Sequence, residues 1–255
     1  MSNLFDLTGR IALVTGATGR LGRVMTRTLA EAGADTWAVA RGASRLDALA
    51  ASVGCRAFPA DVTSDADMTA LGDALRAGPG RLDVLVHNAH VGRGGTLASS
   101  STGDFVEAAD LALASLKRLL DAARDLLVAA AGDGSPSVIT IASMYGLVSP
   151  RLSLYDAPEA ANPPYYGAVK AGLLQLTRYA AVELAPLGIR VNAITPGPFP
   201  GDADPSLLSR LAAQTPLGRV GDPEEIATAL LFLASPHSSY VTGANVVVDG
   251  GWTIW

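Results

Sequence analysis

Cysteine is nearly absent from the sequence, which contains only Cys55. A single cysteine excludes a disulfide framework and a cluster of thiolate metal ligands, and His87, His90 and His237 lack the spacing of zinc ligands. No apolar run approaches the roughly 18 residues of a membrane-spanning helix, and the N-terminal MSNLFDLTGR lacks the apolar segment of a secretory signal. We therefore expect a cytoplasmic protein with no metal and no membrane partner.

Positive charge is also sparse and scattered. The formal net charge is −5, and lysine occurs only at Lys117 and Lys170. No basic run is present, so the sequence indicates no nucleic-acid partner. Hydrophobic residues make up 49% of the 255 positions, which is enough apolar surface to cover a sheet on both faces.

Strand-like and helix-like segments alternate along the whole chain. Short apolar runs predict strands at 10–16, 36–41, 55–62, 82–89, 137–143, 189–197 and 244–251. Helical spacing of apolar residues predicts helices at 20–33, 45–52, 65–76, 103–130, 165–185 and 223–235. This order favours an α/β fold: one Rossmann-type domain over 1–255, doubly wound, with a mainly parallel seven-stranded sheet and helices on both faces. The long irregular stretch at 144–164 predicts a functional loop.

The segment VTGATGRLG at 14–22 lies between the first predicted strand and the first predicted helix. Gly16, Gly19 and Gly22 allow a tight turn, and the helix that follows presents free N–H groups to a phosphate. The second strand ends at Arg41, where an NAD site usually has a carboxylate, and an arginine there suits a 2′-phosphate. With Arg20 adding positive charge, the loop predicts binding of NADP(H) in preference to NAD(H).

Tyr166 and Lys170 are four residues apart in a predicted helix and therefore share a face. A nearby ammonium favours the phenolate and would lower the pKa of the tyrosine from its usual value near 10. Lysine can also bind a ribose, whereas a planar guanidinium would impose another geometry. Tyr165 points elsewhere on the helix.

These motifs, in this order, resemble those of the short-chain dehydrogenase/reductase family over the whole chain. The matching segments are TGATGRLG at 15–22, Asp61-Val62, HNAH at 87–90, IAS at 141–143, YGAVK at 166–170, NAITPGP at 192–198 and VVVDGG at 246–251. Members related to 3-oxoacyl-carrier-protein reductases and to sugar and alcohol dehydrogenases are the most similar. The resemblance implies a carbonyl reductase or alcohol dehydrogenase acting on a small molecule.

The resemblance also assigns roles to residues. Tyr166 becomes the general acid or base, Lys170 the residue that lowers its pKa and binds the nicotinamide ribose, and Ser143 the residue that binds the substrate oxygen. Cofactor contacts fall to Gly16, Thr18, Gly19, Arg20, Leu21, Arg41, Asp61, Val62, Asn88, Ala89, Tyr166, Lys170, Pro196, Gly197 and Phe199. Pocket walls fall to His90, Val91, Tyr145, Leu147, Tyr155, Tyr165 and Phe199, with Pro198 beside them.

Four departures from the family pattern stand out. Gly19 comes one position early, as in epimerases and dehydratases, and His90 replaces a usual glycine. Ala112 replaces the asparagine that in the family holds a water linking the lysine to solvent. The spacing from Ser143 to Tyr166 is lengthened by LVSPRLSLYDAPEAANPP, which we expect to form part of the substrate pocket.

Two alternatives to an NADP(H)-dependent reductase remain open. Ala112 and His90 are compatible with a cofactor-binding sensor or scaffold, and the displaced Gly19 with an epimerase or dehydratase. The sequence does not identify the substrate. Leucines along 103–130, together with Trp252 and Trp255, predict a homotetramer, with a homodimer as the runner-up.

Overall fold

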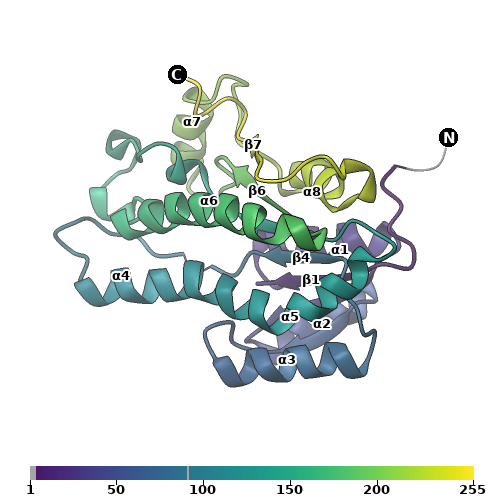
Figure 1. Ribbon diagram of the computed structural model, residues 1–255. Coiled ribbons are helices and arrows are strands. Elements are labelled where there is room, and N and C mark those ends of the chain that lie inside the picture. Colours follow the sequence, from purple (N-terminus) through teal and green to yellow (C-terminus); the bar gives the residue numbers. More distant parts are fainter. Residues whose placement is uncertain (1–3, 91) are drawn as a thin grey trace.

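Seven parallel strands form one sheet in the computed structural model, which describes residues 4–90 and 92–255. The strand order is β3-β2-β1-β4-β5-β6-β7, and every neighbouring pair is parallel. Helices surround the sheet (Figure 1). The order changes direction between β1 and β4, the position at which open α/β sheets bind their ligands. The predicted α/β Rossmann-type fold is confirmed, and the sheet is entirely parallel.

All seven predicted strands are present. Six are shorter than their apolar runs, and β2 has the predicted length but begins one residue earlier. The strands are β1 (Ile11–Thr15), β2 (Asp35–Ala40), β3 (Arg56–Pro59), β4 (Val84–His87), β5 (Ser137–Ile141), β6 (Arg190–Pro196) and β7 (Asn245–Val248). The helices are α1 (Arg20–Glu31), α2 (Ala43–Val53), α3 (Asp65–Ala77), α4 (Thr102–Ala109), α5 (Ser115–Ala131), α6 (Pro164–Leu184), α7 (Pro205–Ala213) and α8 (Ile226–Ala234).

Alternate residues of each strand serve opposite faces of the sheet. Ala12 and Val14 of β1 pack with α1, α2 and α8, whereas Leu13 packs with α3, α5 and α6. Because both faces are covered by helices, the central strands are buried along their whole length, which explains their continuous apolar runs. The core is therefore two apolar layers, one on each side of the sheet.

Two helical segments differ from the prediction. The single helix expected at 103–130 is interrupted by a π-helical turn, Asp110–Ala114, between α4 and α5. There the Ser115 hydroxyl donates to the Leu111 carbonyl at 2.5 Å. Helix α7 was not predicted, although its signals are present: Asp204 caps it, Pro205 begins it, and its leucines have helical spacing.

The stretch 144–164 consists of short 3₁₀ helices that pack against α7. Met144, Tyr145 and Leu154 form a small apolar cluster with Leu211 of α7 and with Trp252. Arg210 of α7 donates to the Leu154 carbonyl at 2.6 Å and to Asp156 at 2.9 Å. The stretch is thus fixed to an element more than fifty residues later in the chain.

Among the described residues, no helix has the combination of length and apolar character needed to cross a membrane. The same residues contain no group of three or more histidine, cysteine or acidic side chains placed to bind a metal ion.

A buried arginine joins the start of β6 to the end of α8. The Arg190 guanidinium is 4% exposed and donates to the carbonyls of Leu233 at 3.0 Å and Ser235 at 3.2 Å, and to the Ser135 hydroxyl at 2.9 Å. Burial lowers the pKa of this group to about 10. Its acceptors among the described residues are uncharged, so its contribution comes from hydrogen bonds rather than from ion pairs. The Leu233 and Ser235 carbonyls also accept from the Ser238 hydroxyl, whereas the guanidinium joins them to Ser135.

Replacing this arginine should therefore weaken the fold. We expect Arg190→Met to lower the free energy of unfolding by about 3 kcal/mol, since several buried acceptors lose a donor. Urea denaturation followed by circular dichroism measures this. Arg178→Met is the control, because Arg178 is exposed on α6 and, within the described part of the chain, its side chain bonds only Gln175. Equal midpoints for both variants would contradict the role of Arg190.

Candidate active site

The carboxyl ends of β1, β4, β5 and β6 meet at one edge of the sheet. The glycine loop follows β1, Asn88 and Ala89 follow β4, Ser143 follows β5, and Gly197 follows β6. Open parallel sheets bind ligands at this edge. The topology thus gathers four of the sequence motifs that were found far apart in the chain.

The glycine loop passes so close to its neighbours that side chains are excluded. Gly16 has φ +62°, and a Cβ there would lie 2.9 Å from Cα of Ala89. A Cβ on Gly22 would lie 2.1 Å from the Gly16 carbonyl oxygen. Gly19 provides the N-cap of α1 without a side-chain hydrogen bond, so the positive end of the helix dipole faces the loop. This arrangement suits a phosphate group.

A cavity of about 390 Å³ extends from this loop across the ends of β2 and β3. The predicted cofactor residues that line it are Gly16, Thr18, Gly19, Arg20, Leu21, Arg41, Asp61, Val62, Asn88 and Ala89. Arg45, which the sequence analysis did not select, lines it as well. The Arg41 guanidinium lies 3.8 Å from the Asp61 carboxylate. This cavity therefore combines three arginines with one carboxylate.

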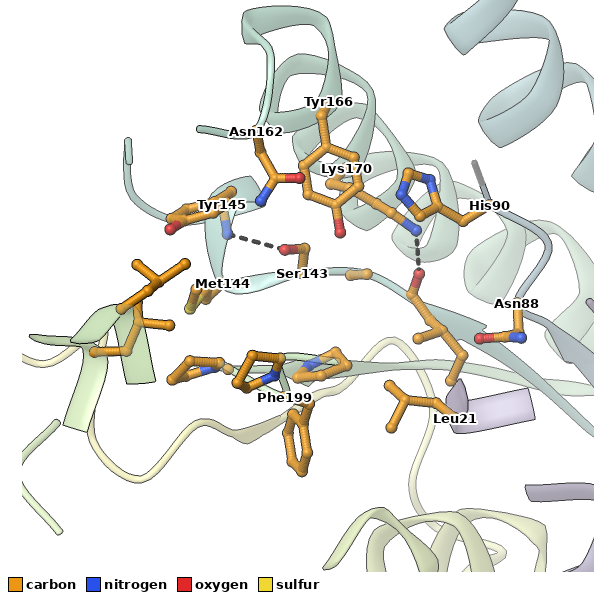
Figure 2. A pocket seen from close by; sticks show the side chains of 18 of the residues that line it. Leu21, Asn88, His90, Ser143, Met144, Tyr145, Asn162, Tyr166, Lys170 and Phe199 are labelled. Carbon is orange, nitrogen blue, oxygen red and sulfur yellow. Dashed lines mark hydrogen bonds between the residues drawn. The ribbon is translucent and has the colours of Figure 1, made fainter. Parts of the chain in front are cut away.

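A second cavity, of about 370 Å³, contains Ser143, Tyr166 and Lys170 in its wall (Figure 2). Pro196, Gly197 and Phe199, predicted as cofactor contacts, line this cavity too. The two cavities share Leu21, Asn88 and His90. The two cavities therefore adjoin, and we call them together the groove, with the reactive side chains at one end and the arginines at the other.

Two glycines bring the reactive side chains together. A Cβ on Gly167 of α6 would lie 2.7 Å from the Tyr145 carbonyl oxygen, and a Cβ on Gly146 would lie 2.8 Å from the Lys170 carbonyl carbon. The turn that follows Ser143 can thus pack directly on the α6 backbone. The Lys170 ammonium reaches back to donate to the Ile141 carbonyl at 2.6 Å.

Burial sets the ionisation of this centre. It raises the pKa of the Tyr166 hydroxyl, an effect that the neighbouring Ser143 hydroxyl opposes, and it lowers the pKa of Lys170 to about 8. The Lys170 ammonium lies 5.8 Å from the centre of the Tyr166 ring. In the protein alone, the desolvation of the phenolate outweighs the hydrogen bond from Ser143, so the pKa of Tyr166 is raised. The lowering of this pKa by Lys170 stays a prediction.

Residues 16–253 match the model of a family described as enoyl-(acyl carrier protein) reductase. The chain belongs to the short-chain dehydrogenase/reductase family. It is an oxidoreductase that acts on carbonyl or alcohol groups and uses a nicotinamide cofactor.

Three similar proteins illustrate the range of the family. The rhamnolipids biosynthesis 3-oxoacyl-[acyl-carrier-protein] reductase of Pseudomonas aeruginosa is 35% identical over 263 residues, covering 99% of each chain. The galactitol 2-dehydrogenase (L-tagatose-forming) of Cereibacter sphaeroides is 35% identical, covering 99% of this chain and 98% of the relative. The Pseudomonas aeruginosa RhlG/NADP active-site complex has a TM-score of 0.88 at 34% identity, covering 99% of this chain and 100% of that one.

In this short-chain dehydrogenase/reductase, His90 lies where the two cavities meet. Its ring lies 4.7 Å from the ring of Tyr166, tilted by 47°. Although one side of His90 is exposed, the enclosing protein and the Lys170 ammonium lower the pKa of its imidazole. His87 is fully buried beneath the site, where its Nε2 lies 2.8 Å from the Ser115 hydroxyl. Both histidines are neutral at pH 7.

The predicted pocket walls fall into two groups. His90, Tyr145, Tyr155, Phe199 and Pro198 line the cavity with the reactive residues. Leu147 and Tyr165 do not: Leu147 lines a separate groove, and Tyr165 contacts Phe105 with ring centres 5.6 Å apart. Val91 lies outside the described residues. Four residues that were not predicted from the sequence line the same cavity: Met144, Asn162, and Leu207 and Leu211 of α7.

Ala112 lies in the π-helical turn behind the site. It is buried, and with Lys170, Tyr166 and His90 it lines a small cavity of about 40 Å³. Asp104 and Glu107 line the same cavity toward the protein surface. A cavity of this size has room for water. The alanine thus leaves a space behind Lys170 where the family has an amide side chain.

The contact at Gly167 should be essential to the site. We expect Gly167→Ala to destabilise the protein by about 1–3 kcal/mol, because its methyl group would collide with the Tyr145 carbonyl. Helix propensity alone predicts the opposite sign, a gain of about 1 kcal/mol. Urea denaturation measures the change, and steady-state assays should show reduced turnover.

Gly172→Ala is the matched control in the same helix. A Cβ there would meet Leu113 at 3.4 Å, an ordinary packing distance. Its stability should be unchanged or higher. A Gly167→Ala protein as stable and active as the Gly172→Ala protein would show that the close approach is dispensable.

Proposed function

We propose that the protein is an NADP(H)-dependent oxidoreductase that reduces the carbonyl of a small molecule, or oxidises the corresponding secondary alcohol. The observation that carries this proposal is the meeting of Ser143, Tyr166 and Lys170 in one cavity that continues into the groove of the glycine loop. The groove provides glycines that a larger residue could not replace, an uncapped helix N-terminus and cationic side chains, which together fit a dinucleotide.

Each reactive side chain then has a distinct role in reduction. Ser143 donates a hydrogen bond to the substrate oxygen, and Tyr166 gives its proton to that oxygen as negative charge develops on it. Lys170 would hold the nicotinamide ribose, with Pro196, Gly197 and Phe199 beside the ring. When bound, the cofactor supplies or accepts the hydride. Any positive charge brought close to Tyr166 would lower its pKa, against the effect of burial.

The preference for NADP(H) rests on the arginine end of the groove. Arg20, Arg41 and Arg45 line the cavity at the end of β2, where a 2′-phosphate would lie, and Asp61 is partly neutralised by Arg41. Arg41 also lowers the pKa of the Asp61 carboxyl, together with stronger hydrogen bonds from Thr63 that oppose its burial. The similar Pseudomonas structure is a complex with NADP.

Arg41→Ala should therefore change the cofactor preference. Loss of a charge-assisted contact to phosphate should weaken NADPH binding by about 10- to 100-fold while NADH binding changes little. Quenching of the dihydronicotinamide fluorescence gives both dissociation constants. Arg178→Ala, on the far part of α6, serves as the control. Equal effects on the two cofactors would show that Arg41 does not select between them.

Tyr166→Phe removes only the proposed proton donor. We expect ketone reduction to fall by about 100- to 10,000-fold, the usual contribution of general acid catalysis, with NADPH binding nearly unchanged. Absorbance of the reduced nicotinamide follows the reaction. Tyr165→Phe should retain most activity, because Tyr165 lies outside the cavity that contains Ser143, although it lines the small cavity beside Ala112. Reduction by Tyr166→Phe at the parent rate would defeat the assignment.

The same assays separate the alternative functions. Tight NADPH binding without turnover of any ketone or alcohol would favour a sensor. Ala112, in place of the asparagine expected from the family pattern, is the residue compatible with that function. Release of an epimerised or dehydrated product without net change in the cofactor would favour an epimerase or dehydratase. The intact set of Ser143, Tyr166 and Lys170 supports the oxidoreductase.

We further propose that four chains assemble into a homotetramer, with a homodimer as the runner-up. The apolar surface differs from the one expected: Leu116 and Leu119 of α5 are core residues, and Trp252 is buried. Among the exposed apolar residues, Tyr179 and Val182 on α6 are 65% and 78% exposed, and Ile254 and Trp255 at the C-terminus are 79% and 67% exposed. Apolar side chains left in water on these two elements favour association.

Light scattering at micromolar concentration should give about four times the mass of one chain. Val182→Glu, which places a charge on the exposed face of α6, should shift the mass toward that of smaller species. A monomer mass for the parent protein would contradict both the tetramer and the dimer.

A further inference from the structure

The substrate cavity has a second set of polar groups, apart from Ser143 and Tyr166. They come from the stretch 144–164, which lengthens the chain between the two reactive residues. The Tyr145 and Tyr155 hydroxyls lie 2.9 Å apart, so one donates to the other. One hydroxyl proton and several oxygen lone pairs of these two tyrosines thus remain available to bind a ligand.

Asn162 adds an amide to the same wall. Figure 2 shows its side chain between Tyr145 and Tyr166, and Asn162 lines the cavity. The contacts recorded for the described part of the chain include no hydrogen bond of this amide. An amide offers both donors and an acceptor. A half-buried amide without a protein partner is a suitable group to bind a polar ligand atom.

Charge in this cavity is nearly absent. Lys170 is the only charged side chain among the described lining residues, and it donates to the Ile141 carbonyl. His90 is neutral, because the pKa of its imidazole is lowered. Arg210 is nearby in α7, but its guanidinium is bound to Leu154 and Asp156. A carboxylate on the substrate, away from the reacting carbon, would therefore be buried without a counter-ion, which is unfavourable.

The polar groups are held in place by contacts from elsewhere in the chain. Arg210 bonds on both sides of Tyr155, at the Leu154 carbonyl and at the Asp156 carboxylate. Tyr145 is buried in the cluster with Leu211 and Trp252. Groups that are ordered before binding lose less entropy when they bind a ligand, which favours a specific role in recognition.

We propose that Tyr145, Tyr155 and Asn162 form a second recognition point for an uncharged substrate that carries another oxygen beyond the reacting carbonyl. Ketones with an ester, thioester or hydroxyl oxygen belong to this class, and keto acids do not. Met144, Leu207 and Leu211 supply the apolar wall beside the carbon chain. This inference rests on the proposed oxidoreductase function and narrows its substrate.

The test compares three ketones: ethyl acetoacetate, with a second oxygen; hexan-2-one, without one; and the acetoacetate anion. The parent protein should reduce the ester fastest and the anion slowest. Tyr155→Phe and Asn162→Leu should each lower kcat/KM for the ester by about tenfold more than for hexan-2-one, as expected for loss of one hydrogen bond to a polar substrate group. Comparing the losses within each variant cancels the different reactivity of the ketones.

Tyr240→Phe is the control, because Tyr240 is fully exposed on the surface, outside the lining of the substrate cavity. Its kcat/KM for each of the three compounds should equal that of the parent protein. Equal losses for ester and ketone in both cavity variants would overturn the recognition point and leave the oxidoreductase intact. Faster reduction of the anion than of the ester would overturn the exclusion of charge. Failure of the parent to reduce any ketone would instead defeat the proposed function.

Discussion

The close contact between the turn after Ser143 and helix α6 is the constraint on which the site depends. Gly146 and Gly167 permit it, since a methyl group at either position would collide with backbone atoms. The contact fixes Ser143 relative to Tyr166 and Lys170 without using a flexible side chain. Helix α6 is itself fixed by Leu173, Ala180 and Leu184 in the core beneath the sheet. The reactive groups therefore inherit the rigidity of the fold rather than that of a loop.

The fold could be predicted from the sequence because burial repeats along each element. The apolar runs gave all seven strands, and the glycine loop marked the binding edge. What could not be predicted depends on contacts between distant residues. Arg210 bonds the Leu154 carbonyl across 56 positions, next to Tyr155, which lines the cavity. Trp252 is buried by a cluster of residues that are distant in the sequence, and Leu147 lines a separate groove.

The two ends of the groove have opposite electrostatic character. Arg20, Arg41 and Arg45 gather where a phosphate would lie, whereas the substrate end has Lys170 as its one charged side chain among the described lining residues, beside tyrosines, an amide and apolar groups. An anionic ligand group is favoured at the arginine end and, away from Lys170, disfavoured at the other. The groove therefore orients an elongated, unevenly charged molecule without any contact specific to its middle.

The small cavity behind Ala112 has a consequence for the order of events during turnover. Tyr166 and Lys170 line both that cavity and the substrate cavity, on opposite sides. A ligand that fills the substrate cavity would leave this second cavity, which Asp104 and Glu107 also line, unfilled. If Tyr166 is the proton donor and water in this cavity exchanges with solvent, we expect the phenolate to regain its proton while product is still bound. Reprotonation and product departure would then be independent events rather than successive ones.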